Sequence, residues 1–230
     1  MARALRHDGL RQVAVVLAAV AAYELLRMGI TPDWPVALAH ARDVASLERA
    51  AHVAWEAPLQ HAFLRVPDVV WALNVFYLVH FAATGLFFVW LYRGSRRAFG
   101  VYRDAFLLAT AAALAVHVAY PSAPPRLAGV GLVDTLRALS GIRFGSVSDP
   151  VAALPSLHAG WAVGVGIGLW RRSRVVAIAY PAAVVLTILV TGNHFVVDAV
   201  AGAATMVFAL AVVQFASRRG VEQSGSSPGS

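Results

Sequence analysis

Long apolar runs alternate with short polar stretches along most of the 230-residue chain. Runs of about 17–25 mostly apolar residues are long enough to cross a bilayer as helices. The pattern predicts six spans, at residues 10–28, 69–91, 105–120, 156–170, 175–191 and 195–216. We therefore expect an all-α fold, a polytopic membrane helix bundle with six transmembrane helices that forms one domain over residues 1–217. Residues 218–230 are rich in Gly and Ser and are expected to be a disordered cytoplasmic tail.

The segment 41–66 carries charges throughout and is too polar to be a span. Its apolar residues recur at a roughly helical spacing, at Val44, Leu47, Ala51, Val53, Trp55 and Leu59. This spacing predicts an amphipathic helix that lies in the outer membrane interface. An ordinary loop helix packed on the bundle would give the same pattern.

The composition supports a membrane protein and excludes several other classes. Hydrophobic residues make up 59% of the chain and charged residues 13%, which is too little charge to cover a soluble domain. The absence of cysteine excludes disulfides and thiolate metal sites. All 19 basic residues are arginines in short clusters between apolar runs, which is typical of membrane topology signals. We expect membrane lipids and no nucleic acid as partners.

The arginines are distributed unequally between the two sides of the predicted spans. Twelve of the 19 lie on the side that contains both chain ends, with three acidic residues, while the other side carries seven arginines and eight acids. Cytoplasmic loops are enriched in arginine, so we expect an integral plasma membrane protein with both termini in the cytoplasm. Segments 31–68, 121–155 and 192–194 then face outward. The first span is interpreted as an uncleaved anchor in preference to a cleaved signal peptide, because its apolar run continues past the small residues AAVAA.

Three polar elements fall at the outer ends of the predicted helices. The first, YPSAPPRLAG at 120–129, follows the third span. Its prolines end the helix and stiffen the turn, which gives Arg126 a fixed place at the membrane edge. A lone interfacial arginine is also explained as an anchor whose charge extends to water.

The second element is PSLH at 155–158, the start of the fourth span. Pro155 suits the first turn of a helix, and Ser156 suits a capping role. The N–H groups of Leu157 and His158 would then point out of the helix start, where anions such as phosphate bind. The equally favoured alternative is a capped helix with a histidine packed in the bundle.

The third element is TGNHFVVDAVAGA at 191–203. His194 and Asp198 are four residues apart, so on a helix they share one face. A carboxylate that accepts a bond from one imidazole nitrogen fixes the tautomer and activates the other nitrogen as a nucleophile or base. A structural pair that ties helices together is the less favoured alternative. Asn193 beside this pair is a candidate for binding the substrate.

Together the three elements suit phosphoryl transfer. Arg126, Ser156 and the N–H of Leu157 would hold phosphate oxygens and stabilise the charge that develops in the transition state. One histidine would attack phosphorus, and the other would protonate the leaving oxygen.

Two hypotheses from other classes are less favoured. The side chains of His158, His194 and Asp198 also make up a two-histidine, one-carboxylate triad that would hold iron or zinc. A scaffold or transporter without enzymatic activity would also have several spans, but the chain shows no inverted repeat or broken helix.

PSLH, followed about 36 positions later by HFVVD, resembles the second and third motifs of the phosphatidic acid phosphatase type 2 superfamily. The earlier PSAPPR and the sequence NVFYLVH at 74–80 resemble the branch that includes inositol phosphorylceramide synthases. The resemblance covers most of residues 71–202. It implies a six-helix membrane bundle with an outward-facing site that requires no metal and no other cofactor.

The resemblance also implies roles for the residues. His194 would be the nucleophile that forms a phosphohistidine, Asp198 would orient it, and His158 would be the general acid. Arg126 and Ser156 would bind phosphate. We favour hydrolysis of a lipid phosphate or diphosphate (polyprenyl, phosphatidyl or similar). Transfer of a phospho-head group, such as phosphoinositol, to a lipid or polyol hydroxyl would use the same residues and is the alternative.

The chain departs from the wider superfamily in two places. The usual Ser-Arg pair six residues before the nucleophile is replaced by Thr187 and Ile188, and the usual lysine of the first motif is absent. The phosphate would then have fewer cationic ligands, unless Arg137 or Arg143 in the outer loop compensates.

Further polar residues line the second span. Asn74, Tyr77 and His80 recur every three or four residues and therefore share one helix face. They are candidates for binding the head group or the acceptor, and buried hydrogen-bonded packing is the alternative. For His117 in the third span we prefer packing.

Overall fold

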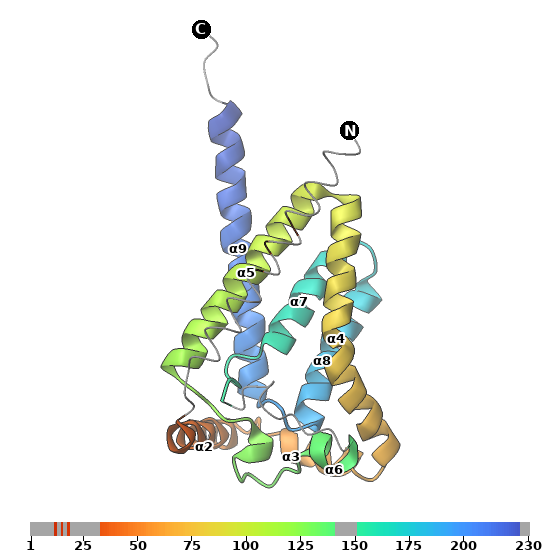
Figure 1. Cartoon of the computed structure of the whole chain (residues 1–230), viewed down its shortest axis with the longest axis vertical. Helices are drawn as coiled ribbons and strands as arrows, with labels where there is room; N and C mark the ends of the chain where they lie inside the picture. The colour runs from red at the N-terminus through yellow and green to blue at the C-terminus, as the bar shows by residue number, and fades with distance from the viewer. Residues whose placement is uncertain (1–11, 13–14, 16–17, 19–32, 141–150, 226–230) are drawn as a thin grey trace. The chain divides into compact units, whose positions relative to one another are not determined.

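The computed structural model describes residues 12, 15, 18, 33–140 and 151–225. Residues 1–32 and 33–230 form two separate units, and the first predicted span lies almost entirely outside the described residues. The second unit is helical (Figure 1), with α2 (Trp34–Ala50), α3 (Glu56–Phe63), α4 (Pro67–Gly94), α5 (Arg96–Ala119), the 3-10 turn η1 (Pro125–Leu127), α6 (Thr135–Ser140), α7 (Leu157–Leu169), α8 (Arg174–Val190) and α9 (Val196–Gly225).

Three described helices are long and apolar enough to cross a membrane, namely α4, α5 and residues 196–219 of α9. They correspond to the second, third and sixth predicted spans. The fourth and fifth are also helical, but α7 has 13 residues and α8 has 17. At about 1.5 Å per residue α7 is roughly 20 Å long, which is shorter than the roughly 30 Å of hydrocarbon in a bilayer. By length, α7 and α8 are therefore short apolar helices.

The ends of the helices follow from local capping. Ser95, Ser156 and Ser173 each accept a hydrogen bond from the backbone N–H three residues later, at 3.2–3.3 Å, and so begin α5, α7 and α8. Pro155 therefore precedes the cap and lies outside the first turn of the helix, where the sequence predicted it. At the other end of the chain, α9 continues to Gly225, past the boundary expected at residue 217.

The segment 41–66 forms two helices, α2 and α3, where one was predicted. The chain turns between them at His52, which has a positive φ of 59°. The face of α2 that is buried consists of Ala37, Ala41, Val44, Ala45 and Glu48. Leu47 and Trp55 are 58% and 56% exposed. The prediction of one continuous helix is wrong, because the turn at His52 interrupts the helical spacing, and the location in the outer interface stays a prediction.

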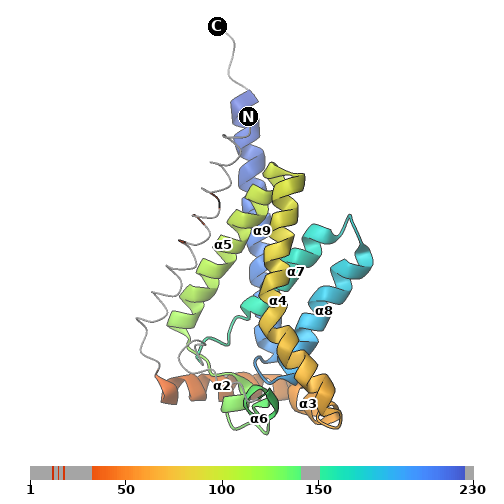
Figure 2. The same cartoon turned by 45° about the vertical axis from the view of Figure 1, so that its right-hand side comes forward.

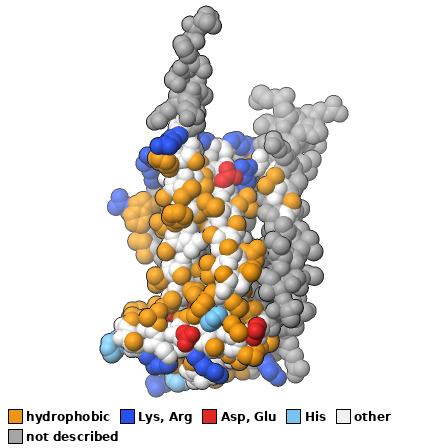
Figure 3. Space-filling model, turned by 90° about the vertical axis from the view of Figure 1, so that its left-hand side faces the viewer, with side chains coloured by type: hydrophobic (Ala, Val, Ile, Leu, Met, Phe, Trp, Pro, Cys, Tyr) orange, Lys and Arg blue, Asp and Glu red, His pale blue; other side chains and the backbone are white. Residues whose placement is uncertain are grey.

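The two ends of the helical unit differ in what they contain. Figures 1 and 2 show α2, α3 and α6 at one end, and the connection between α4 and α5 at the other. Figure 3 shows hydrophobic side chains over the middle of the helices and charged side chains gathered toward both ends. This distribution is the one expected of helices that cross a bilayer.

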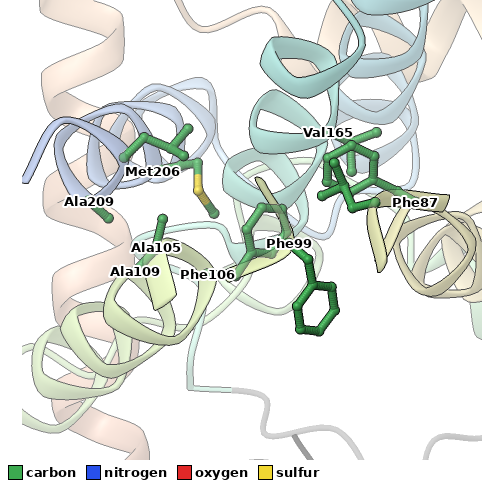
Figure 4. Packing of buried hydrophobic residues seen from close by; sticks show 10 residues of the cluster. Phe87, Phe99, Ala105, Phe106, Ala109, Val165, Met206 and Ala209 are labelled. Atoms are coloured by element: carbon green, nitrogen blue, oxygen red, sulfur yellow. The ribbon is translucent and has the colours of Figure 1, made fainter. Parts of the chain in front are cut away.

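The main apolar core lies toward the end at which α4 and α5 meet. Its buried members are Phe87, Leu91, Phe99, Ala105, Phe106, Ala109, Val165, Met206, Ala209 and Leu210. Figure 4 shows members of this cluster, from α4, α5, α7 and α9. The core fixes these four helices against one another without any polar contact within the cluster.

Candidate active site

Glycine allows α7 and α9 to approach closely at the other end of the unit. A Cβ at Gly160 would lie 2.8 Å from the Gly202 carbonyl oxygen, and a Cβ at Gly202 would overlap the backbone of Ser156. The Ser156 N–H also donates to the Asp198 carbonyl at 2.9 Å. The start of α7, which carries His158, is therefore held directly beside the start of α9.

His194 lies in the turn that leads from α8 into α9, two residues before the helix begins. Gly192 has a positive φ of 69° in this turn, and the N–H groups of Asn193 and His194 both donate to the Ile188 carbonyl. Asp198 is in the first turn of α9, and its Oδ2 accepts from the Phe195 N–H at 2.9 Å. The two residues are near each other, but the predicted geometry of two side chains on one helix face is wrong. They meet because Asp198 caps the helix that His194 precedes.

The orientation of His194 is set by a backbone carbonyl. Its Nδ1 lies 2.9 Å from the Ala153 carbonyl oxygen and 3.5 Å from Asp198 Oδ2. A carbonyl can only accept, so Nδ1 carries the proton and the lone pair is on Nε2. Ala153 is itself fixed, because its N–H donates to the Ser122 carbonyl at 3.0 Å. Nothing in the sequence marks Ala153, since it acts through its backbone.

His158 lies next to His194, and their ring centroids are 5.5 Å apart. The His158 ring stacks on Tyr77 of α4 at 4.4 Å, and the His80 ring is 5.0 Å away. Nε2 of His158 is buried without a hydrogen-bond partner. A buried donor or acceptor without a partner is costly, so a substrate atom is a natural partner for this nitrogen.

Arg126 extends from η1 toward the turn that carries His194. Its Nη1 donates to Asn193 Oδ1, and its backbone N–H donates to the Gly192 carbonyl at 3.0 Å. Nε lies 3.5 Å from Asp134 Oδ2 and has no hydrogen-bond partner. The guanidinium therefore keeps a donor for a further anion beside the turn that carries His194.

The start of α7 supplies a cap and free donors. Ser156 is buried, and its Oγ accepts from the Ala159 N–H at 3.3 Å. Among the described residues, the backbone N–H groups of Leu157 and His158 have no hydrogen-bond acceptor. These two N–H groups are the kind of helix-start donors that bind phosphate oxygens.

The three polar residues on one face of α4, Asn74, Tyr77 and His80, have two different kinds of partner. Asn74 bonds with Thr135 of α6 through both its amide and its oxygen, at 3.0 and 2.9 Å. Tyr77 and His80 instead contact His158, and His80 Nδ1 lies 3.0 Å from the Tyr180 hydroxyl.

The remaining candidate residues are His117, Arg137 and Arg143. His117 is buried, with Nε2 3.2 Å from the Pro155 carbonyl, which confirms its packing role. Arg137 is exposed on α6, and Arg143 lies outside the described residues.

Three buried polar residues of α2 and α3 were not predicted. Glu48 Oε1 accepts from the Val197 N–H, and Glu56 Oε1 accepts from the Val196 N–H, both at 2.7 Å. Gln60 Nε2 donates to the Val190 carbonyl at 2.9 Å, at the end of α8. The i, i+4 spacing of Glu56 and Gln60 is a signal that would have indicated a shared face, although it does not indicate burial.

Burial raises the pKa of Glu48 from 4.5 to about 8. The hydrogen bond from Val197 partly offsets this effect, and the neighbouring charges of Glu56 and Asp198 add to it. Glu48 is therefore protonated near neutral pH, which lets it lie close to two other carboxyl groups.

Within residues 33–140 and 151–225, no three His, Asp or Glu side chains are arranged to hold a metal ion. Nδ1 of His194 and Oδ2 of Asp198 are already engaged by Ala153 and Phe195. In this arrangement these two atoms are therefore not available as metal ligands.

A sequence model described as the PAP2 superfamily matches residues 42–212, which include every candidate catalytic and phosphate-binding residue. No curated protein and no solved structure was found to match the chain.

Proposed function

Because the chain belongs to the PAP2 superfamily, we propose that it is a membrane enzyme that hydrolyses a lipid phosphate or diphosphate through a phosphohistidine at His194. Members of this superfamily are generally phosphatases or phosphotransferases that act on lipid phosphates. The observation that carries the proposal is the Ala153 carbonyl at Nδ1 of His194. It leaves Nε2 as the nucleophilic nitrogen, beside His158.

The reaction has two steps that use the same groups. In the first, His194 Nε2 forms a bond to phosphorus while the bond from phosphorus to the leaving oxygen breaks, and His158 gives that oxygen a proton. The leaving oxygen belongs to the lipid alcohol in a monophosphate and to the lipid monophosphate in a diphosphate. In the second, water attacks phosphorus, His158 takes a proton from the water, and the bond to His194 breaks. Inorganic phosphate leaves, and both histidines return to their starting states.

The surrounding donors stabilise the negative charge on phosphate. Arg126 and the N–H groups of Leu157 and His158 are the donors we assign to the phosphate oxygens. Ser156 caps the helix that presents these N–H groups, and its hydroxyl can also donate a hydrogen bond to a phosphate oxygen. With Thr187 and Ile188 in place of the usual Ser-Arg pair, Arg126 is the main cationic ligand. No metal is needed in this scheme.

We propose six spans, both termini in the cytoplasm of a plasma membrane protein, and an outward-facing site. The arginine distribution and the apolar character of α7 and α8 support this arrangement. Short helices such as α7 are compatible with it if the outer ends lie below the membrane surface, where a lipid head group enters.

Transfer to an acceptor hydroxyl is the second candidate. His80 favours it, since its buried Nε2 has no hydrogen-bond partner and its ring lies 5.0 Å from that of His158. An acceptor hydroxyl bound there would replace water in the second step, as in the synthase branch that the motifs resemble.

The test is phosphate release from a panel of lipid phosphates and diphosphates by the purified protein in detergent with EDTA. We expect release by the wild type, none by His194→Ala, and strongly reduced release by His158→Ala. His61→Ala is the matched control, because His61 is an exposed histidine of α3. Activity that survives in His194→Ala would overturn the proposal, and loss on chelation would indicate a metal enzyme. No phosphate release in water, together with formation of a phosphorylated alcohol when an acceptor is added, would establish transfer.

A further inference from the structure

The first turn of α9 is held by carboxyl groups from three helices. A helix start leaves its first N–H groups without partners inside the helix. Here three consecutive N–H groups each donate to a carboxyl oxygen, of Asp198 at Phe195, of Glu56 at Val196 and of Glu48 at Val197. One side-chain acceptor is usual for a helix cap. The extra two come from α2 and α3, which are more than 130 residues earlier in the chain.

This arrangement is costly, which argues for a specific role. Glu48 and Asp198 are 0% exposed and Glu56 is 4% exposed. Burying carboxyl groups together is unfavourable unless each is hydrogen-bonded. The positive end of the helix dipole offsets part of the cost. A serine or an exposed aspartate would cap α9 without the cost of burying carboxyl groups.

We propose that Glu48 and Glu56 are positioning residues for the reaction at His194, an inference that rests on the function proposed above. They fix the first turn of α9, whose Asp198 carbonyl also holds the Ser156 N–H of α7. His194 immediately precedes this turn, so the turn sets the distance between His194 and both Ala153 and His158. The outer helices α2 and α3 are thereby part of the catalytic apparatus without contacting the substrate.

The role depends on an acceptor oxygen, and this distinguishes it from general packing. Glu48→Ala and Glu56→Ala remove the acceptor and let the turn shift. A displacement of about 1 Å at a reacting group costs up to about 100-fold in rate. We therefore expect kcat to fall about 10- to 100-fold in each alanine variant, with KM changed less than about threefold. Glu48→Gln and Glu56→Gln keep the oxygen and should stay within about threefold of the wild type.

The experiment measures kcat and KM for these four variants and for Asp43→Ala, an exposed acid of α2, as the matched control. Glu48→Asp and Glu56→Asp are added because an alanine variant can fail to fold. They keep the carboxyl group but draw its oxygen back by one methylene, and should also lose kcat. Retention of kcat by the alanine variants would overturn the inference, as would glutamine variants that are as slow as the alanine variants.

A second readout separates this inference from the proposed function. Hydrogen exchange at residues 195–198 is measured by mass spectrometry in the same variants. We expect faster exchange in the alanine variants and unchanged exchange in the glutamine variants and Asp43→Ala. If the wild type hydrolyses no lipid phosphate, or if His194→Ala stays active, the proposed function fails. The exchange data then still decide whether the carboxylates hold the turn, and unchanged exchange in the alanine variants would overturn that.

Discussion

Where α4 meets α5, the interior consists of aromatic and aliphatic side chains such as Phe87, Phe99 and Phe106, which pack without polar contacts within the cluster. Where α2 and α3 lie, the interior contains Glu48, Glu56, Gln60, Asn74, Thr135, Asn193, His194 and Asp198, most of them with a named hydrogen-bond partner. Apolar packing is non-directional and tolerates changes of similar volume. Buried polar groups fix direction and are costly when one partner is lost. The apolar end therefore holds the helices together, while the polar end fixes the positions of individual side chains. A reaction needs fixed side-chain positions, and the two histidines lie at the polar end.

After the complete loss expected for His194→Ala, the largest effect is expected at the polar end from the loss of a single proton donor. His158→Ala should lower kcat on lipid phosphates by about 10²–10⁴-fold, which is the usual contribution of a general acid. With an aryl phosphate, whose leaving group needs no proton, the same variant should show a much smaller fall in kcat. Steady-state kinetics with both substrates make the measurement, and an equal loss on both would assign His158 a role other than general acid.

At the apolar end, Phe106→Ala should change stability and spare the chemistry. Loss of a buried phenyl group costs about 3–5 kcal/mol, while the activity per folded molecule should stay close to that of the wild type. Thermal unfolding in detergent, alongside kcat, tests this. A tenfold loss of kcat without loss of stability would show that the two ends are not independent.

The close contact between α7 and α9 at Gly202 should affect both stability and catalysis. Gly202→Ala places a Cβ against the Ser156 backbone, and overpacking of this kind costs about 1–3 kcal/mol. We expect lower stability together with lower kcat, because the Ser156 and Asp198 backbones must move apart. Gly85→Ala is the control, since a Cβ there meets nothing within 4 Å. Equal behaviour of the two variants would contradict the close approach.

The smallest effect concerns the proton on Glu48. Its pKa is about 8 in the folded chain and 4.5 ordinarily, so the folded state holds the proton more tightly. This contribution to stability is fully present below pH 4.5 and is lost as pH rises to about 8. The charged groups that face Glu48 are Glu56 of α3 and Asp198 of α9. The melting temperature should therefore fall less steeply between pH 5 and pH 8 in Glu48→Gln than in the wild type, and identical slopes would contradict the shift.

Much of the helical framework could be predicted from the sequence, because span length and apolarity are local properties. Helices α4, α5 and α9 follow from them, and the proximity of His158 to His194 follows from both lying at the same ends of neighbouring helices. The turn at His52 was missed, since charge and spacing alone do not indicate where an interfacial helix breaks. The roles of Ala153, Glu48 and Glu56 were also missed. A backbone carbonyl has no sequence signal, and a glutamate in a charged segment looks exposed until a helix start is placed against it.

The central claim is that His194 Nε2 forms a covalent bond to phosphorus. The direct measurement is rapid denaturation of the protein during turnover of a lipid phosphate labelled in its phosphate group, followed by mapping of the label. We predict an acid-labile, base-stable phosphate on the peptide that contains His194, which is absent in His194→Ala and present in His61→Ala. Turnover without any labelled peptide, or a label on a different residue, would contradict the claim.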